Sequence, residues 1–190
     1  MRRAVLAGVV VVFCATILVP ISLLGVLSEL PSLPLGNPAA LSALFGAGNA
    51  LVPDGQASPA ARGALAYALA RIGTPYVWGG TGNGGFDCSG LVMVAYASVG
   101  VNLPRTAQEQ FDAGPALPPD APLLPGDLVF FGDSSASVDH VGMVLTSTGT
   151  MVDAPHTGAE VRVESFPTTP GSPWGDLVYL GATRPAPEDP

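Results

Sequence analysis

Cys88 is the residue of this chain best suited to act as a nucleophile. It lies in Phe86-Asp87-Cys88-Ser89-Gly90, where a glycine-rich stretch over 79–85 changes into an apolar, helix-like pattern. The other cysteine, Cys14, lies in an uncharged hydrophobic run near the N-terminus, so Cys88 has no expected disulfide partner in its own domain. Secreted domains usually pair their cysteines or omit them, because an exposed single thiol oxidises. A cysteine kept at a loop-to-helix junction therefore indicates a thiol nucleophile.

The expected position of Cys88 at the start of a helix suits this chemistry. A thiol reacts well only as a thiolate, and the N–H groups at a helix N-terminus favour an anion there. The same groups could stabilise the oxyanion that forms when an acyl group is attacked. A buried, inert cysteine is the alternative, but the polar neighbours Asp87 and Ser89 make an apolar environment a poor fit.

The chain has two histidines, which limits the choice of a general base for this thiol. His140 begins an apolar, strand-like segment directly after the polar residues 134–139. The end of a strand can hold an imidazole rigidly beside a cleft, so we expect His140 to be the base. His156 lies in a loop after the next strand, which is more typical of a cleft wall or of the surface. We keep it as a minor alternative base and as a candidate for lining the substrate cleft.

A catalytic imidazole needs a polar partner on its second ring nitrogen. Asp153 follows His140 by 13 residues, across a predicted hairpin. A two-residue turn at 148–149 would place Asp153 opposite Val144 and on the same face of the sheet as His140, because side chains alternate with period two. Asp153 is therefore the favoured third catalytic residue.

Two other arrangements remain open at this point. A register slip of one residue would put His156 opposite His140 instead. Asp139 is also acidic, but as the immediate neighbour of His140 it should point to the opposite face of the strand.

Three helices are expected before any strand. Ser58-Pro59 places a hydroxyl cap before a proline in the first helical position, and apolar residues at helical spacing follow over 60–72. A second helix is expected over 88–98. Thr106-Ala107-Gln108-Glu109 is a capping box that opens a third helix to about residue 113.

The pattern changes to strands after residue 126. The candidates are 127–131, 140–146, 150–154, 160–166 and 177–183. Helices followed by strands predict an α+β fold, in which a helical layer packs on one side of an antiparallel sheet of about five strands.

Residues 1–27 predict a signal-anchor or a signal peptide. Arg2 and Arg3 precede 24 uncharged residues, 4–27, and a helix of that length would cover roughly 36 Å, enough to cross a ~30 Å hydrocarbon core. The arginines favour a cytoplasmic N-terminus and an exported remainder. The lack of a convincing cleavage site favours a retained anchor over a cleaved signal peptide.

Composition sets the other boundaries and excludes some partners. Residues 28–56 are rich in Pro, Gly and Ala, as in a linker, residues 57–184 form the expected domain, and residues 185–190 form a flexible tail. Beyond residue 27 the chain has five arginines, no lysine and 15 acidic residues. Such a domain repels phosphate backbones, so nucleic-acid binding is not expected.

Five ordered blocks over about residues 57–184 resemble the NlpC-type (p-sixty) family of bacterial cell-wall peptidases. They are Tyr-Val-Trp-Gly-Gly at 76–80, Asp-Cys-Ser-Gly at 87–90, Arg-Thr with a later glutamine at 105–110, Pro-Gly-Asp-Leu-Val-Phe-Phe at 125–131 and His-Val-Gly-Met at 140–143. Each block alone is weak, but all five in this order are specific.

The resemblance implies a papain-like α+β fold with Cys88 as nucleophile and His140 as base. The family's polar third residue falls on the strand after the base strand, which matches Asp153. Members hydrolyse peptide bonds in peptidoglycan stems, commonly between D-glutamate and a diamino acid.

The resemblance also implies a substrate-binding role for three residues near the nucleophile. Tyr76, Asp87 and Ser89 match positions that line the family's cleft. Core packing is the alternative role of Tyr76, and capping of the helix is the alternative role of Asp87.

The expected protein is thus a cell-wall hydrolase without metal or cofactor, because two histidines and a lone cysteine make a poor zinc set. Its expected partners are peptidoglycan stem peptides, the membrane through residues 1–27, and an envelope machinery. We expect a monomeric domain outside the cytoplasm, anchored in the membrane or secreted to the wall. The alternatives are a wall-binding module that cleaves nothing, and a papain-like amidase or acyltransferase on another substrate.

Overall fold

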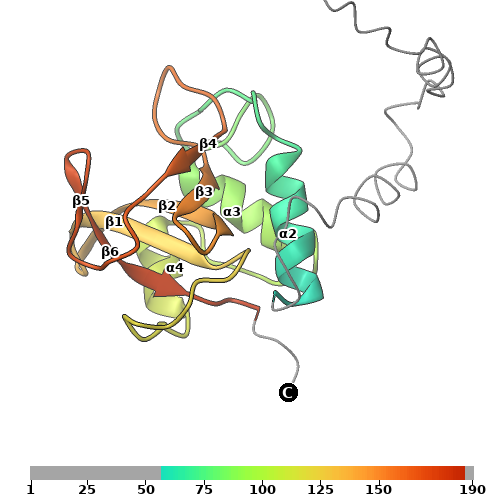
Figure 1. The fold of residues 1–190 in the computed structure, drawn as a ribbon. Helices are drawn as coiled ribbons and strands as arrows, with labels where there is room; N and C mark the ends of the chain where they lie inside the picture. Colours follow the sequence, from blue (N-terminus) through green and yellow to red (C-terminus); the bar gives the residue numbers. More distant parts are fainter. Residues whose placement is uncertain (1–56, 187–190) are drawn as a thin grey trace, which may run out of the picture. The chain divides into compact units, whose positions relative to one another are not determined.

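The computed structural model describes residues 57–186, in which three helices precede six strands (Figure 1). The helices are α2 (Pro59–Leu69), α3 (Cys88–Ala97) and α4 (Ala107–Ala113). The strands are β1 (Leu128–Ser134), β2 (Ser137–Thr146), β3 (Thr150–Asp153), β4 (Arg162–Ser165), β5 (Pro173–Trp174) and β6 (Leu177–Thr183). The expected order of helices before strands is confirmed within these residues.

Each of these helices begins at a side chain that caps it. Ser58 caps α2 and is followed by the proline in the first helical position. Asp87 caps α3, and Thr106 with Glu109 makes both hydrogen bonds of the expected capping box at the start of α4. The caps satisfy N–H groups that have no acceptor inside a helix. Local sequence therefore fixes the residue at which α3 begins.

The six strands form one antiparallel sheet in the order β4-β3-β2-β1-β6-β5. Five of them correspond to the predicted strands. The sixth, β5, was not predicted and is a two-residue strand that pairs with the start of β6. Two residues are too few for an alternating pattern to be visible in a sequence.

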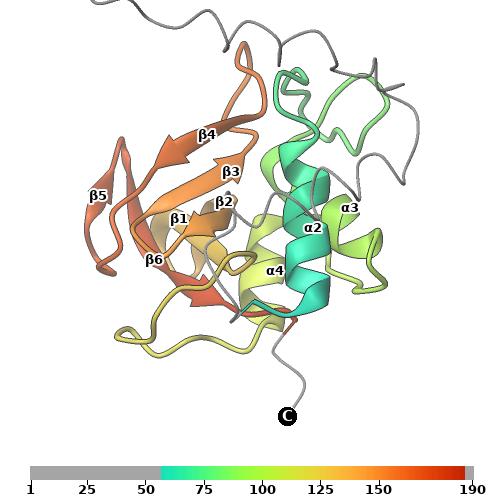
Figure 2. The ribbon, with the colours of Figure 1, turned by 45° about the vertical axis from the view of Figure 1, so that its right-hand side comes forward.

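The helices lie on one side of the sheet (Figures 1 and 2). The core between helices and sheet contains Leu65 and Phe130, both fully buried. A second apolar cluster contains Phe131, Val144 and Tyr179. Because neighbouring side chains of a strand point to opposite faces, Phe130 and Phe131 of β1 belong to the two different clusters. The sheet is thus covered by apolar side chains on both faces.

A β-bulge in β2 sets the direction of His140. Phe131 pairs with His140, but the next residue, Gly132, pairs with Val138, so Asp139 is an extra residue opposite β1. Asp139 is exposed, whereas His140 is buried. Bulges of this kind interrupt the alternation and re-aim a side chain.

The β2–β3 hairpin differs from the prediction. Thr146 pairs with Thr150 across a three-residue turn, and a second register shift lies between Val144 and Thr146. Val144 therefore pairs with Met151, and the expected pairing of Val144 with Asp153 is wrong. The extra residues move the acid two positions closer to the candidate base along the neighbouring strand, and it stays on the same face because the alternation has period two.

The predicted membrane segment at 4–27 and the linker at 28–56 lie outside the described residues, as does most of the tail at 185–190. Within residues 57–186, no helix combines the length and the apolar character needed to cross a membrane.

Candidate active site

Cys88 is the first residue of α3, and 9% of its surface is exposed to a cleft. The amide groups of Cys88 and Ser89 lie in the first turn, where a helix offers no acceptor. These groups and the helix dipole favour negative charge beside the sulfur. The position can therefore hold both a thiolate and an oxyanion.

The glycine-rich loop packs directly on this first turn. A Cβ at Gly90 would lie 2.1 Å from the carbonyl oxygen of Gly80. The same oxygen accepts a hydrogen bond from the N–H of Asp87 at 3.1 Å. Glycine at position 90 therefore allows the loop backbone to reach the helix that carries Cys88.

His140 and Asp153 are joined by a hydrogen bond. The Nε2 atom of His140 lies 2.9 Å from Oδ2 of Asp153, and both side chains are almost fully buried. Nε2 is thereby occupied, which leaves Nδ1 as the ring nitrogen available to Cys88. The structure brings together all three residues that the sequence selected as nucleophile, base and third residue.

The surroundings of His140 favour its protonated form. Burial by itself lowers the pKa of His140, but hydrogen bonds to Asp153 and Cys88, together with the negative charges of both partners, raise it to about 9. The ordinary value is about 6.5. A thiol beside a hydrogen-bonded, buried imidazole is the arrangement that activates a cysteine nucleophile.

Two aromatic rings flank the imidazole, and sequence reasoning did not select either of them as a site residue. Trp174 of β5 stacks on His140 with ring centroids 5.2 Å apart and an angle of 19° between the planes. Phe131 of β1 lies 6.0 Å from the imidazole. No local signal points to Trp174, because its strand has two residues and lies far from His140 in the sequence.

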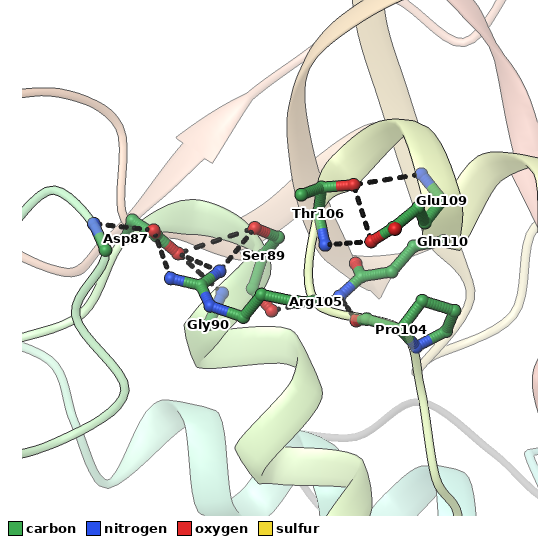
Figure 3. A network of polar contacts seen from close by, with 9 residues as sticks. Asp87, Ser89, Gly90, Pro104, Arg105, Thr106, Glu109 and Gln110 are labelled. Carbon is green, nitrogen blue, oxygen red and sulfur yellow. Dashed lines mark hydrogen bonds and ion pairs between the residues drawn. The ribbon is translucent and has the colours of Figure 1, made fainter.

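Asp87 is the centre of a polar network beside the nucleophile (Figure 3). Its Oδ1 accepts the N–H of Gly90 at 2.7 Å, and its Oδ2 accepts the N–H of Gly79 at 2.9 Å. Arg105 donates to both oxygens at 3.0 and 2.6 Å, and also to Oγ of Ser89 at 3.0 Å. The alternative role of Asp87 as a helix cap is thus confirmed, and the same carboxylate ties the glycine-rich loop and Arg105 to α3.

Gln110 of α4 is a buried residue that contacts the same polar network (Figure 3). Its Nε2 donates to the carbonyl oxygens of Ser89 at 3.0 Å and of Pro104 at 2.9 Å. The buried amide therefore links the first turn of α3 to the segment that carries Arg105. Gln110 and Arg105 both belong to a motif that the sequence singled out, although neither was selected as a site residue.

The cleft consists of two hollows that meet at Cys88. The first has a volume of about 370 Å³ and is lined by Asp87, Ser89 and Arg105 among others. The second has a volume of about 640 Å³ and is lined by His140 together with residues of β4, β5 and the loop after β3. Four residues line both hollows: Tyr76, Trp78, Cys88 and Asp139. A chain-like substrate can therefore lie across the sulfur with one end in each hollow.

Tyr76 stands at the junction of the hollows and also packs partly against the core. Burial, followed by the negative charges of Cys88 and Asp87, raises the pKa of Tyr76, against a smaller opposite effect of Arg105. Its phenol therefore stays protonated and can donate a hydrogen bond. The core-packing alternative is compatible with this position.

His156 is exposed and lines the second hollow. Its Nδ1 lies 3.0 Å from the carbonyl oxygen of the neighbouring Thr157. A register slip of one residue does occur at the turn, where Thr146 pairs with Thr150, but the second shift beside Val144 moves the register by one more residue. His156 is therefore not in register with His140, and His140 makes the hydrogen bond to Asp153.

The part of the chain that the structure describes contains no group of three His, Cys, Asp or Glu side chains that could hold a metal ion.

A cysteine at the start of a helix, facing a histidine on an adjoining antiparallel sheet, defines the papain-like class of folds. The chain belongs to the NlpC/P60 family, whose model matches residues 73–178. The resemblance inferred from the five sequence blocks is confirmed.

Named relatives agree with this assignment. The chain is 32% identical to peptidoglycan endopeptidase RipA of Mycolicibacterium smegmatis over 139 residues, which are 66% of this chain and 27% of that protein. It is 39% identical to murein DD-endopeptidase MepH of Escherichia coli over 120 residues, 61% of this chain and 42% of that protein. The match thus covers less than half of either relative's length.

Among solved structures, an NlpC/P60 family protein from Bacillus cereus has a TM-score of 0.60 and 33% sequence identity, over 68% of this chain and 41% of that one. The likeness supports the papain-like fold of three helices and a curled sheet of six strands.

Proposed function

We propose that this protein is a peptidoglycan hydrolase, a cysteine endopeptidase that cleaves amide bonds of stem peptides. The observation that carries the proposal is the grouping of Cys88, His140 and Asp153, with Cys88 at the place where two hollows meet and His140 lining the second of them. Membership of a family whose named relatives are peptidoglycan and murein endopeptidases supports the choice of substrate.

In the first half of the reaction the sulfur of Cys88 attacks the carbonyl carbon of the scissile amide. A carbon–sulfur bond forms, and the carbonyl electrons move onto oxygen, where the first amides of α3 stabilise the negative charge. The intermediate collapses as the carbon–nitrogen bond breaks, and His140 gives its proton to the leaving amine. A thioester on Cys88 remains.

In the second half, water replaces the amine. His140 takes a proton from the water as its oxygen attacks the thioester carbon. The carbon–sulfur bond breaks, the carboxylic acid leaves, and the thiolate–imidazolium pair is restored. Asp153 keeps the ring orientation and stabilises the imidazolium throughout.

The position of His140 assigns a direction to the substrate. The imidazole must reach the leaving nitrogen, and it lines the second hollow but not the first. The acyl part of the stem therefore occupies the hollow with Asp87, Ser89 and Arg105. The residue that leaves with a free amine occupies the hollow with His156.

The second hollow also bears on which bond is cut. Its lining carries three carboxylates and one arginine: Asp139, Glu164, Asp176 and Arg162. The arginine pairs with Glu164. An excess of negative charge there suits a leaving residue with a second, positively charged amine, as in a D-glutamyl–diamino acid bond.

We further propose that residues 57–184 are the catalytic domain and that residues 1–27 export it, as a signal-anchor or a signal peptide. The substrate lies outside the cytoplasm, so an exported domain would meet it. This proposal rests on the sequence pattern of residues 2–27.

The test is digestion of purified muropeptides of defined stem composition by the full chain, with products read by mass spectrometry. We expect wild-type protein and Cys14→Ala to cut one stem bond, and Cys88→Ala and His140→Ala to leave the peptides intact while still folded. Full activity of Cys88→Ala would rule out the mechanism. Release of ammonia or acyl transfer without peptide cleavage would indicate the alternative amidase or acyltransferase.

A further inference from the structure

Trp174 joins the two edges of the sheet. It belongs to β5, which ends the strand order, whereas β4 ends it on the other side. Yet the indole Nε1 of Trp174 donates to the carbonyl oxygen of Ser165 in β4 at 3.0 Å. Four strands separate β4 from β5 in the sheet, so this bond requires the sheet to curl until its edges approach each other.

The candidate base lies inside this curl. The Trp174 ring stacks on the imidazole of His140 at 5.2 Å and packs against Phe131 at 4.4 Å. Phe131 in turn lies 6.0 Å from the imidazole. The imidazole therefore has an indole against one face and a phenyl ring close by, and the indole is fixed at its far end by the bond to β4.

We propose that Trp174 is a positioning residue, which holds the imidazole of His140 in the orientation that points one ring nitrogen at Asp153 and the other at Cys88. The inference extends the proposed function to a residue that touches neither the scissile bond nor the sulfur. This role concerns only the orientation of the base, so it does not depend on which substrate the cleft binds.

The single hydrogen bond between His140 and Asp153 explains why a second constraint is needed. The other oxygen of Asp153, Oδ1, is buried without a hydrogen-bond partner within the described residues. A histidine ring turns easily about its last side-chain torsion, which has a broad energy profile. One hydrogen bond anchors a nitrogen but permits this tilt, whereas a ring stacked on the imidazole face opposes it.

Trp174 also keeps water from the His140–Asp153 bond. The side chain of His140 is 6% exposed and that of Asp153 is fully buried. In such a dry environment the hydrogen bond is stronger than in water. Removing the indole would open the bond to solvent from the side of the second hollow, which Trp174 lines.

Three variants separate positioning from simple packing. Trp174→Phe keeps an aromatic ring against His140 but loses the donor to Ser165, Trp174→Ala loses both, and Ile72→Ala removes an exposed apolar side chain that does not line either hollow. The first measurement is the rate at which iodoacetamide alkylates Cys88 as a function of pH, which needs no substrate. The second is kcat and KM on a defined muropeptide.

We expect the pH of the alkaline change in alkylation rate to shift in Trp174→Ala, because the loosened ring loses part of its contact with Asp153 and Cys88 and is at the same time more exposed to water. We also expect kcat to fall by about 10- to 100-fold, as for other small misplacements of a catalytic group. Trp174→Phe should recover most of both properties, and Ile72→Ala should match the wild type. A folded Trp174→Ala protein with unchanged alkylation profile and kcat would overturn the proposal.

A spectroscopic measurement on a folded protein covers the case in which Trp174→Ala does not fold. The chain has two tryptophans, so Trp78→Phe leaves Trp174 as the only indole. A protonated imidazole stacked on an indole quenches the fluorescence of that indole. In Trp78→Phe the emission of Trp174 should therefore rise with pH as His140 loses its proton. This rise should be absent in Trp78→Phe/His140→Gln. Emission that does not respond to His140 would contradict the stacked arrangement and the proposal with it.

These outcomes are distinct from a failure of the proposed function. If the wild-type chain cuts no stem peptide but alkylation of Cys88 and the emission of Trp174 respond as expected, the positioning role stands and the substrate assignment falls.

Discussion

The imidazole of His140 and the carboxylate of Asp153 lie 2.9 Å apart, on neighbouring strands whose register is shifted by a bulge beside Val144. Together with the three-residue turn, this shift replaces the predicted pairing, which would have left the two side chains four residues apart along the strand. Diagonal neighbours on adjacent strands are within reach of a long or aromatic side chain, whereas residues four apart are not. The geometry of the candidate base thus depends on irregularity in a hairpin.

Asp153→Asn tests the charge of this partner. The amide keeps the size of the side chain but loses the negative charge that stabilises the imidazolium of His140. We expect kcat to fall by about 10²- to 10⁴-fold, the range typical of a disturbed histidine tautomer. Asp133→Asn, which changes an exposed carboxylate that does not line either hollow, serves as the control. Muropeptide hydrolysis by Asp153→Asn at the wild-type rate would remove Asp153 from the mechanism.

Catalysis should weaken on the alkaline side with a midpoint near pH 9. The pKa of His140 is raised to about 9, and above it the thiolate–imidazolium pair loses its proton. The measurement is kcat/KM against pH, which reports groups of the free enzyme. In Asp153→Asn the midpoint should move to lower pH, because the carboxylate is one cause of the raised value. An unchanged midpoint in Asp153→Asn would show that a group other than His140 causes the alkaline loss of activity.

The same raised pKa predicts a dependence of stability on pH. The folded protein binds the His140 proton more tightly than the unfolded chain, whose value is about 6.5. The stabilisation is therefore fully present below about pH 6.5 and is lost as the pH rises through about 9. Thermal unfolding temperatures should fall over this window in the wild type, and the fall should be smaller in His140→Gln. An equal fall in unfolding temperature with pH in both proteins would show that His140 is not the group responsible.

Arg105→Met should destabilise the domain more than Arg162→Met. Arg105 makes two hydrogen bonds to Asp87, whose side chain is 11% exposed, while the Arg162–Glu164 pair is more exposed on both sides. Loss of one partner leaves Asp87 with its backbone donors only, at a cost of about 1–2 kcal/mol after allowance for solvent screening around Arg105. The exposed pair should contribute about 0–1 kcal/mol. Denaturant unfolding measures both, and equal losses would show that the network around Asp87 is not needed for stability.

Gly90→Ala should disturb the first turn of α3. Its Cβ would meet the oxygen of Gly80 at 2.1 Å and Oδ1 of Asp87 at 2.8 Å, so the loop must move away from the helix. Overpacking of this kind costs about 1–3 kcal/mol. The control is Gly63→Ala inside α2, where the Cβ meets a methyl group of Val99 at 2.7 Å and the gain in helix propensity is about 1 kcal/mol. Similar unfolding free energies for the two variants would argue against a tight loop–helix contact.

The sequence by itself determined the local features of this protein. Capping residues indicated where the first and third helices begin, and the change from a glycine-rich stretch to an apolar helical pattern placed Cys88 at the start of the second. Period-two alternation placed Asp153 on the face of His140, and the order of helices before strands gave the α+β class. Each of these signals depends on residues that lie within a few positions of one another, so it can be read directly from the sequence.

Only the tertiary structure decided how these parts meet. The register of β2 and β3 depends on bulges, and alternation gives the face of a residue but not its pairing partner. The stack of Trp174 on His140 requires a sheet curled far enough for β5 to reach β4, which no local pattern records. Contacts of this kind form between residues that are distant in sequence. They therefore stabilise the protein only after the complete sheet has formed and curled.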